Sequence, residues 1–417
     1  MQRSWRILLT SLGITFVALL SFAAGIWAAP VIRPVVGGGS AGPGAGTSLQ
    51  VLWQVWNIVT DNYVDRSKIN AEQMTYGAIR GMLATLDDPG HTRFLTSADY
   101  RSQENHLQGK FVGIGIVLDS RNGQLIVQEV YPDSPAARVG VQLGDTIVSI
   151  NGMPATNATP DQAANSIRGP RGSSLTLGVR HSGQDAAQIL SLVREDIHLV
   201  SVRWQFLPGT HIADVAISEF SQGTTVGVRD AVTAAKQQGA TQFVVDLRDD
   251  PGGLLDEAVS VSSLFLSSGK VLVERDAHGN EQSHPVQAGA VDTTDPLVVL
   301  VNHGTASAAE IFAAAMQDNH RGAVIGSTTL GTGTVLSTYR LLDGSALLLG
   351  TQEWLTPDGQ SLWKHGVTPT VDVPKTDGDI ILRPGTLDFP STSAQIAGSK
   401  DATLQRGLQT LESAARR

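Results

Sequence analysis

Residues 296–310 read Pro-Leu-Val-Val-Leu-Val-Asn-His-Gly-Thr-Ala-Ser-Ala-Ala-Glu, an apolar run followed by a turn and then by small residues. A short, unbroken run of β-branched and aliphatic residues is typical of a strand buried on both faces. Beyond the turn, residues 308–317 repeat apolar side chains at helical spacing. The stretch therefore predicts a buried strand that leads directly into a helix.

The same order occurs earlier in the chain. Residues 243–247 form a second apolar run, followed by the turn Asp249-Asp250-Pro251-Gly252-Gly253 and by a helical pattern over residues 254–266. Residues 345–353 add a further expected strand. Strands that alternate with helices predict an α/β core.

Ser307 stands at the predicted junction between strand and helix. A Ser at this place often only caps the helix. The same place also offers a nucleophile free backbone N–H groups and the positive end of the helix dipole, which stabilise an oxyanion. Because turn 249–253 lies at a similar junction, the two turns predict one active site. Gly304-Thr-Ala-Ser307 differs from the Gly-x-Ser-x-Gly elbow, so an α/β-hydrolase is excluded as the pattern.

Composition limits the function classes. A chain of 417 residues with 41% hydrophobic and 17% charged residues predicts a globular protein of more than one domain. A net charge of −9 without any Lys/Arg run disfavours nucleic acid as a partner. The chain contains no Cys, its ten His are scattered without a His-Glu-x-x-His pair, and it has no Walker-type loop. We therefore expect no metal and no cofactor.

The N-terminus carries a targeting pattern. Residues 1–6 contain two Arg and no acid, and the next 23 residues, 7–29, are uncharged and largely apolar. This length suits a spanning helix, which predicts a single-pass anchor with the rest of the chain on the extracytoplasmic side. The alternative is a signal peptide cut near the small residues at 23–29. Both interpretations export residues 30–417.

The remaining chain divides by composition. Expected regions are a Gly/Pro linker over 30–48, a helical region over 49–108, a β-rich module over 109–182, the α/β core over 183–375 and a polar tail with one short helix over 376–417. Helical periodicity in the second region predicts that Trp53 and Trp56 belong to a core stripe.

Within residues 109–182, Gly113-Ile114-Gly115-Ile116 precedes Ser134-Pro135-Ala136-Ala137, Gly144-Asp145 and Asn151-Gly152. These motifs in this order resemble a PDZ domain. The resemblance implies that a peptide C-terminus binds at Gly113, Ile114, Gly115 and Ile116, where backbone N–H groups can hold its carboxylate. Lys110 could add positive charge there, or it is an ordinary surface lysine.

Taken together, the helical pair, the PDZ-like module, the segments 246–253 and 302–310, and Asp343-Gly-Ser-Ala346 follow the order of the C-terminal processing (tail-specific) serine peptidases. The resemblance covers residues 49 to 375. It implies an α/β core of the crotonase-like or ClpP-like spiral type and polypeptide substrates with free C-termini. It places the nucleophile at Ser307 and the oxyanion donors at the backbone of Ala308 and of Gly253 or Gly252. The oligomeric state is not implied.

The general base does not follow the family pattern. The family segment Thr-Phe-Gly-Lys-Gly-x-Val-Gln corresponds here to residues 329–336, in which Thr332 replaces the Lys base and Leu336 replaces the Gln that assists it. A Thr hydroxyl cannot accept a proton near neutral pH as a desolvated amine can. Two hypotheses follow: a serine endopeptidase with a substitute base, or a catalytically impaired relative that acts as a membrane-tethered PDZ scaffold.

Three residues are candidates for a substitute base. Glu353 and His365 follow the core strands and could supply a base with its orienting carboxylate, or they could form an ordinary structural pair. His303 precedes Ser307 by four residues, so the shape of the loop decides whether it points toward the nucleophile.

The targeting pattern gives a first testable prediction. A reporter enzyme fused after residue 48 is expected to be exported and to remain with the membrane fraction, because segment 7–29 is long enough to span a bilayer. Reporter activity in the washed membrane and soluble exported fractions measures this. Activity in the soluble exported fraction would indicate a cleaved signal peptide, and activity in the cytosol would contradict both interpretations.

Overall fold

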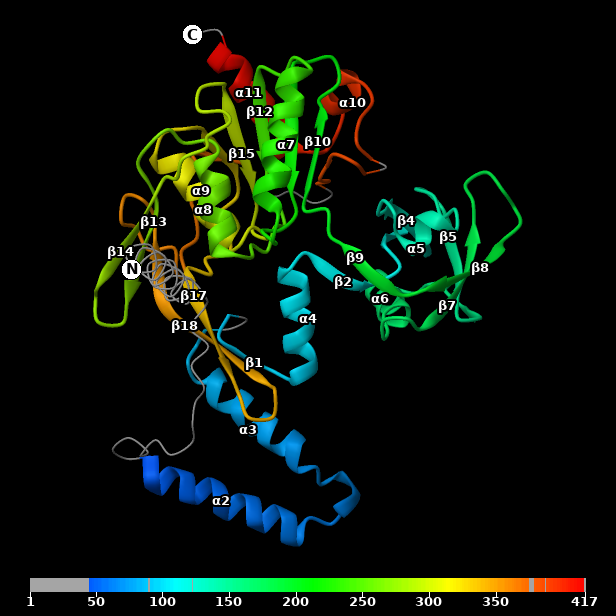
Figure 1. Ribbon diagram of the computed structural model, residues 1–417, viewed down its shortest axis with the longest axis vertical. Helices are drawn as coiled ribbons and strands as arrows, with labels where there is room; N and C mark the ends of the chain where they lie inside the picture. The colour runs from blue at the N-terminus through cyan, green and yellow to red at the C-terminus, as the bar shows by residue number, and fades with distance from the viewer. Residues whose placement is uncertain (1–44, 89–90, 122, 375–378, 387, 416–417) are drawn as a thin grey trace, which may run out of the picture. The chain divides into compact units, whose positions relative to one another are not determined.

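The computed structural model describes residues 45–88, 91–121, 123–374, 379–386 and 388–415 (Figure 1). The predicted anchor at 7–29 and most of the predicted linker lie outside these residues. Among the helices that the structure describes, none combines the length and apolar character needed to cross a membrane. The described residues divide into two compact units, one formed by those of 45–100 together with 336–351, and the other by those of 101–335 and of 352–415.

The first unit contains the two expected helices, which are α2 (Ala45–Asn62) and α3 (Ala71–Ala84), separated by the short η1 (Arg66–Lys68). Because α2 starts at Ala45, the predicted linker ends earlier than residue 48. Asn70 starts α3 by accepting a hydrogen bond from the Gln73 N–H. Strand β1 (Arg93–Leu95) pairs antiparallel with the first part of β18 (Ala346–Leu355).

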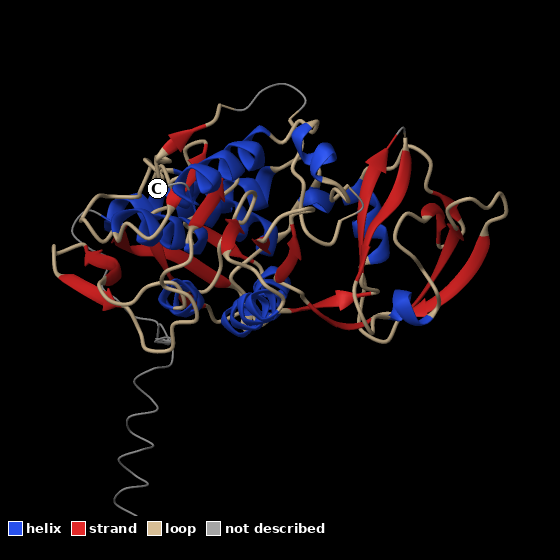
Figure 2. Ribbon diagram, turned by 90° about the horizontal axis from the view of Figure 1, so that it is seen from above, coloured by secondary structure: helices blue, strands red, loops and turns tan. Residues whose placement is uncertain are grey.

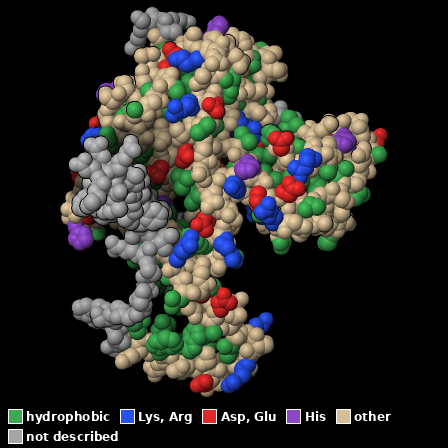
Figure 3. All heavy atoms as spheres, in the orientation of Figure 1, with side chains coloured by type: hydrophobic (Ala, Val, Ile, Leu, Met, Phe, Trp, Pro, Cys, Tyr) green, Lys and Arg blue, Asp and Glu red, His purple; other side chains and the backbone are tan. Residues whose placement is uncertain are grey.

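The predicted core position is wrong for Trp53, whereas Trp56 is partly buried. Trp53 is 62% exposed, and further apolar side chains of α2 are exposed with it, so that apolar side chains gather on the surface over this helix (Figure 3). Trp53 and Trp56 contact each other edge to face, with ring centroids 6.1 Å apart. Periodicity identifies residues that share a helix face, but it does not show whether another element covers that face.

The β-rich module belongs to the second unit and consists mostly of strands with short helices (Figure 2). Its sheet has the order β3-β4-β5-β7-β8, β6 pairs with β5, and β2 pairs with β9 in a separate ladder. Helix α6 begins with a capping box between Thr159 and Gln162. The bounds are β2 (Lys110–Gly113), β3 (Ile116–Arg121), β4 (Gln124–Val130), α5 (Pro135–Arg138), β5 (Thr146–Ile150), β6 (Met153–Pro154), α6 (Pro160–Ile167), β7 (Ser174–Arg180), β8 (Gln188–Val193) and β9 (Glu195–His198).

The module extends beyond its predicted end. Strand β8 continues the sheet that β7 belongs to, and β9 pairs with β2 at the start of the module. The boundary at residue 182 therefore lies too early. A strand edge that pairs with a later segment leaves no mark in local composition, so the sequence pattern ended with β7.

A six-stranded sheet of order β10-β11-β12-β15-β16-β19 forms the centre of the α/β core. All its neighbours pair in parallel except β10 with β11. Side chains alternate along each strand: Val245 and Val299 pack with α7, α8 and α9, whereas Val244 and Val298 pack with the C-terminal segment. The bounds are β10 (Val202–Phe206), β11 (Ile212–Ile217), α7 (Thr224–Gln237), β12 (Gln242–Asp246), α8 (Leu255–Ser263), β15 (Leu297–Val301), α9 (Ala308–Asp318), β16 (Ala323–Gly326) and β19 (Val371–Asp372).

The remaining elements complete the list. In the second unit, β13 pairs with β14 and with the last residues of β18. The bounds are α4 (Ser97–Leu107), β13 (Lys270–Asp276), β14 (Glu281–Pro285), β17 (Thr334–Arg340), α10 (Ser393–Ala397) and α11 (Ala402–Ala415). The strands and helices predicted around 243–266, 296–317 and 345–353 are all present, and the mixed α/β fold class with several domains is confirmed.

The predicted polar tail is instead part of the core. Leu382, Ile396, Leu404 and Leu411 are buried against the face of the sheet opposite α7, α8 and α9. The apolar residues of α11 predict an amphipathic helix, and the structure adds α10 before it. The C-terminal segment packs against a face of the sheet that no other described helix covers. This face exists only once the strands have paired, so the local sequence does not reveal it.

Asp214 gives a prediction for stability. It lies on β11, is fully buried, and neither of its carboxyl oxygens is hydrogen-bonded in the described part of the chain. Burial, and then the charge of Asp246, raise its pKa well above the ordinary value, although Arg248 opposes this. The folded protein thus keeps a proton that the unfolded chain releases above about pH 4.

The stability contributed by this proton is complete at low pH and is lost as the pH rises through the folded-state pKa. Asp214→Asn should therefore become more stable relative to wild type as the pH rises, by up to about 1.4 kcal/mol per pH unit. Urea unfolding between pH 4 and 8 measures this, with Asp230→Asn, an exposed carboxylate on α7, as control. Parallel pH profiles for wild type and Asp214→Asn would contradict the assignment.

Candidate active site

The turn between β15 and α9 holds Ser307 in a strained conformation. Its backbone has φ 54° and ψ −120°, a region that non-glycine residues rarely adopt. The turn is fixed from outside: the Thr305 hydroxyl donates to the Leu247 carbonyl at 2.8 Å, and the Ala306 N–H donates to the Asp250 carbonyl at 2.9 Å. Ser307 is thus presented at the N-terminus of α9.

Glu310, in the first turn of α9, is a buried carboxylate at the centre of the site. It accepts hydrogen bonds from the N–H groups of Ser307 (2.8 Å), Gly331 (2.7 Å) and Thr332 (3.0 Å). The hydroxyls of Thr329 (2.5 Å) and Thr332 (2.8 Å) donate to it as well. These donors tie segment 329–332 to the nucleophile turn.

The same hydrogen bonds exclude Glu310 as a base. A carboxylate offers about four lone-pair sites, and five donors already occupy them. The sequence pattern contains Glu310 but assigned it no role. The Ser-x-x-Glu spacing of Ser307 and Glu310 at a predicted helix start, which is that of a capping box, is the signal that could have identified it.

The two predicted turns meet at Gly252. A Cβ on Gly252 would lie 2.7 Å from the Ser307 Cβ and 2.6 Å from the Ala306 carbonyl oxygen, and its φ is +90°. No other residue type fits this contact without a shift. Turn 249–253 therefore lies directly against Ser307, so the two turns lie together as the sequence predicts.

The free N–H groups in this region suggest which donors face a substrate. The Gly252 N–H donates to Asp250 Oδ1 at 2.7 Å and is thereby engaged. In the described part of the chain, no hydrogen bond uses the N–H of Gly253 or of Ala308. The geometry favours Gly253 over Gly252 as the partner of Ala308 in an oxyanion site. Burial raises the pKa of Asp250 well above its ordinary value.

Thr332 contacts the backbone of the nucleophile residue. Its hydroxyl accepts a hydrogen bond from the Ser307 N–H at 2.7 Å and donates to Glu310 Oε2 at 2.8 Å. Its only proton is committed to Glu310, so the hydroxyl serves to hold the turn. The loop after Thr332 is packed tightly, since a Cβ on Gly333 would lie 2.0 Å from the backbone nitrogen of Trp363.

The three candidate bases lie in different surroundings. Glu353, on β18, accepts a hydrogen bond from the Ser361 hydroxyl and lies 3.7 Å from the Arg275 guanidinium. The side chains of His365 and His303 are exposed. In the described part of the chain, no hydrogen bond joins any of the three candidates to Ser307 or joins Glu353 to His365. Their catalytic roles remain predictions.

The predicted peptide-binding residues form one loop at the edge of the PDZ-like sheet. Gly113 ends β2, Ile116 begins β3, and Gly115 adopts φ +78°. The carbonyls of Ile114 and Gly115 accept hydrogen bonds within the module, whereas their N–H groups donate to no described residue. Strand β3 is an edge strand, and Lys110 is exposed. A free strand edge beside free N–H groups suits an added peptide strand with a terminal carboxylate.

Comparison with known proteins gives consistent results. Residues 211–373 match Peptidase family S41, residues 126–181 match the PDZ domain, and residues 37–93 match the Activating protease CtpB N-terminal domain. The chain is 33% identical over 373 residues to the probable CtpA-like serine protease of Staphylococcus aureus (strain MRSA252), covering 87% of this chain and 72% of the relative. It is 30% identical over 371 residues to the protein of the same description from Staphylococcus epidermidis (strain ATCC 12228 / FDA PCI 1200), covering 87% and 73%.

One solved structure supports the fold. A putative S41 protease from Bacteroides fragilis NCTC 9343 aligns with a TM-score of 0.51 at 18% identity, covering 77% of this chain and 90% of that one.

The contact between the two turns gives a prediction. Gly252→Ala should lower stability by roughly 1 to 3 kcal/mol and abolish the reactivity of Ser307, because the new methyl group collides with the nucleophile turn. Thermal unfolding and covalent labelling by a fluorophosphonate measure the two effects. Gly359→Ala is the matched control, since its φ is +84° and nothing lies within 4 Å of the new Cβ. Equal effects of the two substitutions would show that backbone strain alone is responsible.

Proposed function

Because the chain belongs to peptidase family S41 and carries a PDZ domain, we propose that it is an exported endopeptidase of the C-terminal processing type. The PDZ domain binds the free C-terminus of a polypeptide, and Ser307 attacks a peptide bond of that polypeptide. One observation carries the proposal: Ser307 is held in a strained turn with the unused N–H groups of Ala308 and Gly253 beside it.

The reaction would proceed by acyl transfer. The Ser307 oxygen bonds to the scissile carbonyl carbon, and the two N–H groups stabilise the negative charge on the carbonyl oxygen. The amine leaves with a proton, and water then releases the acyl group from Ser307. Each step needs a group that accepts or returns a proton. Since Thr332 cannot do this, we expect slow turnover, because a general base contributes about 10² to 10⁴ in rate.

A second function is favoured by a specific observation. The Thr332 hydroxyl is committed to the Ser307 backbone and to Glu310. A chain of this kind could act as a catalytically impaired relative, a PDZ scaffold that binds polypeptide C-termini. Export of either form rests on the apolar segment 7–29, as an anchor or as a cleaved signal peptide.

Substitution at position 332 tests the proposal. With an unfolded reporter bearing a free C-terminus, wild type should cleave slowly and Ser307→Ala should be inert. Thr332→Lys should raise the rate by about 10² or more, because an amine can accept the Ser307 proton. Thr332→Arg is the matched control, since it adds the same charge but keeps its proton. If His365 or Glu353 is the substitute base, His365→Ala or Glu353→Gln should lower the cleavage rate by about 10² or more.

The alternative outcome is distinct. If wild type and Ser307→Ala are equally inert, while a free-acid peptide binds more tightly than its C-terminal amide, the scaffold interpretation is correct. If Thr332→Lys and Thr332→Arg behave alike, the missing amine does not limit the rate.

A further inference from the structure

We propose that Arg383, which lies beyond the segment that matches family S41, is a positioning residue for the oxyanion turn 249–253. The inference rests on the proposed function, because it assigns to Arg383 a part in the same reaction. Arg383 acts through the backbone of this turn and does not touch the reacting atoms.

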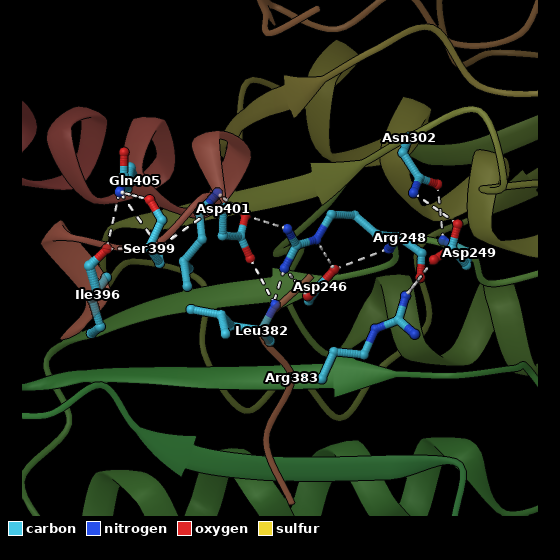
Figure 4. A network of polar contacts seen from close by, with 11 residues as sticks. Asp246, Arg248, Asp249, Asn302, Leu382, Arg383, Ile396, Ser399, Asp401 and Gln405 are labelled. Atoms are coloured by element: carbon cyan, nitrogen blue, oxygen red, sulfur yellow. Dashed lines mark hydrogen bonds and ion pairs between the residues drawn. The ribbon is translucent and has the colours of Figure 1, made fainter. Parts of the chain in front are cut away.

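Arg383 binds the first residue of the turn and the residue before it (Figure 4). Its Nη2 donates to the Arg248 carbonyl and, at 3.1 Å, to Asp249 Oδ2. The other carboxylate oxygen, Asp249 Oδ1, accepts a hydrogen bond from Asn302 Nδ2 at 2.8 Å. In return, Asn302 Oδ1 accepts hydrogen bonds from the N–H groups of Asp249 and Gly304, both at 2.9 Å. Asp249 thus joins Arg383 to the loop that precedes the nucleophile.

The position of Arg383 is itself fixed by its neighbour Leu382. The Leu382 N–H donates to Asp401 Oδ2 at 2.9 Å. The other Asp401 oxygen accepts a hydrogen bond from Arg248 Nη1 at 2.6 Å, and Arg248 also forms a two-pronged ion pair with Asp246 (Figure 4). These three charged side chains are almost fully buried. They anchor the C-terminal segment at the end of β12.

The turn needs such external support. Asp249, Gly252 and Gly253 all adopt positive φ, at 54°, 90° and 147°. A run with three residues in rare conformations stays in place only when its surroundings hold it. The Gly253 N–H lies in this run, and its direction decides whether it can meet an oxyanion. A displacement of about 1 Å at a catalytic group can cost about 10² in rate.

Arg383 differs from the buried anchor in its exposure. Its side chain remains 32% exposed, whereas that of Arg248 is 2% exposed. Removal of Arg248 or Asp401 would leave a buried charge unpaired and weaken the fold. Removal of the partly exposed Arg383 takes one hydrogen bond from the first residue of the turn and one from the residue before it, and it leaves the side-chain contacts of the buried anchor intact. Position and stability can therefore be separated by experiment.

Amide hydrogen exchange on the full chain tests the inference with or without turnover. Arg383→Ala should accelerate exchange at least about tenfold in segments 248–254 and 302–307, with α7 and β16 unchanged. Arg383→Lys should recover part of the protection from exchange, because lysine keeps the positive charge but lacks the planar guanidinium with its several N–H donors. Arg406→Ala is the matched control, since this exposed arginine of α11 donates to Gln409, and in the described part of the chain no hydrogen bond or ion pair joins its side chain to turn 249–253. Where cleavage is measurable, Arg383→Ala should lower kcat by about 10 to 100-fold with KM within about twofold.

Three results would overturn the inference: unchanged exchange at 248–254 in Arg383→Ala, acceleration spread evenly over the whole sheet, or an equal effect of Arg406→Ala. Asp249→Asn removes the same ion pair from the turn side and should give the same local pattern, which decides the matter if Arg383→Ala fails to fold. An inactive wild type would contradict the proposed function alone, because the exchange pattern does not depend on cleavage.

Discussion

The site depends on the hydrogen bonds that the buried carboxylate of Glu310 accepts. A charge without solvent contact is tolerated only when hydrogen bonds replace its hydration. Here the donors come from the nucleophile turn and from segment 329–332, so satisfying the charge forces the two segments together. The start of α9 adds a favourable dipole for the same charge. The strained backbone of Ser307 persists because these bonds leave the turn no alternative.

This arrangement explains how position 332 can lack an amine without losing the turn. Thr332 offers one donor and one acceptor, and the structure uses both, toward Glu310 and toward the Ser307 N–H. The shape of the nucleophile turn and the supply of a base are thus separate properties of the same segment. A substitution can remove the second while the first remains.

The sequence predicted features that depend on neighbours in the chain. Unbroken apolar runs identified β12 and β15, and their junctions with α8 and α9 located Ser307 and turn 249–253. Prediction from the sequence failed where the burial or contacts of a residue depend on segments that are distant in the chain. Trp53 is exposed because nothing in the described chain covers its helix face, and Leu404 is buried because a sheet face was open to it. The contacts of Arg383 with Arg248 and Asp249 join residues 135 and 134 positions apart, which no local pattern encodes.

Oxyanion stabilisation by the backbone and proton transfer by a side chain are separate contributions to the rate, and one can remain when the other is lost. In the proposed mechanism the oxyanion donors are the backbone N–H groups of Ala308 and Gly253, which lie beside the contact of Gly252 with Ser307. The base would be a side chain and can be lost by one substitution. In a well-dissected serine protease, oxyanion and binding contributions alone retain about 10³ to 10⁴ in rate over water after the catalytic side chains are removed. If the proposed mechanism holds, Thr332 lowers the catalytic rate of this site but leaves the contribution of the backbone oxyanion donors in place.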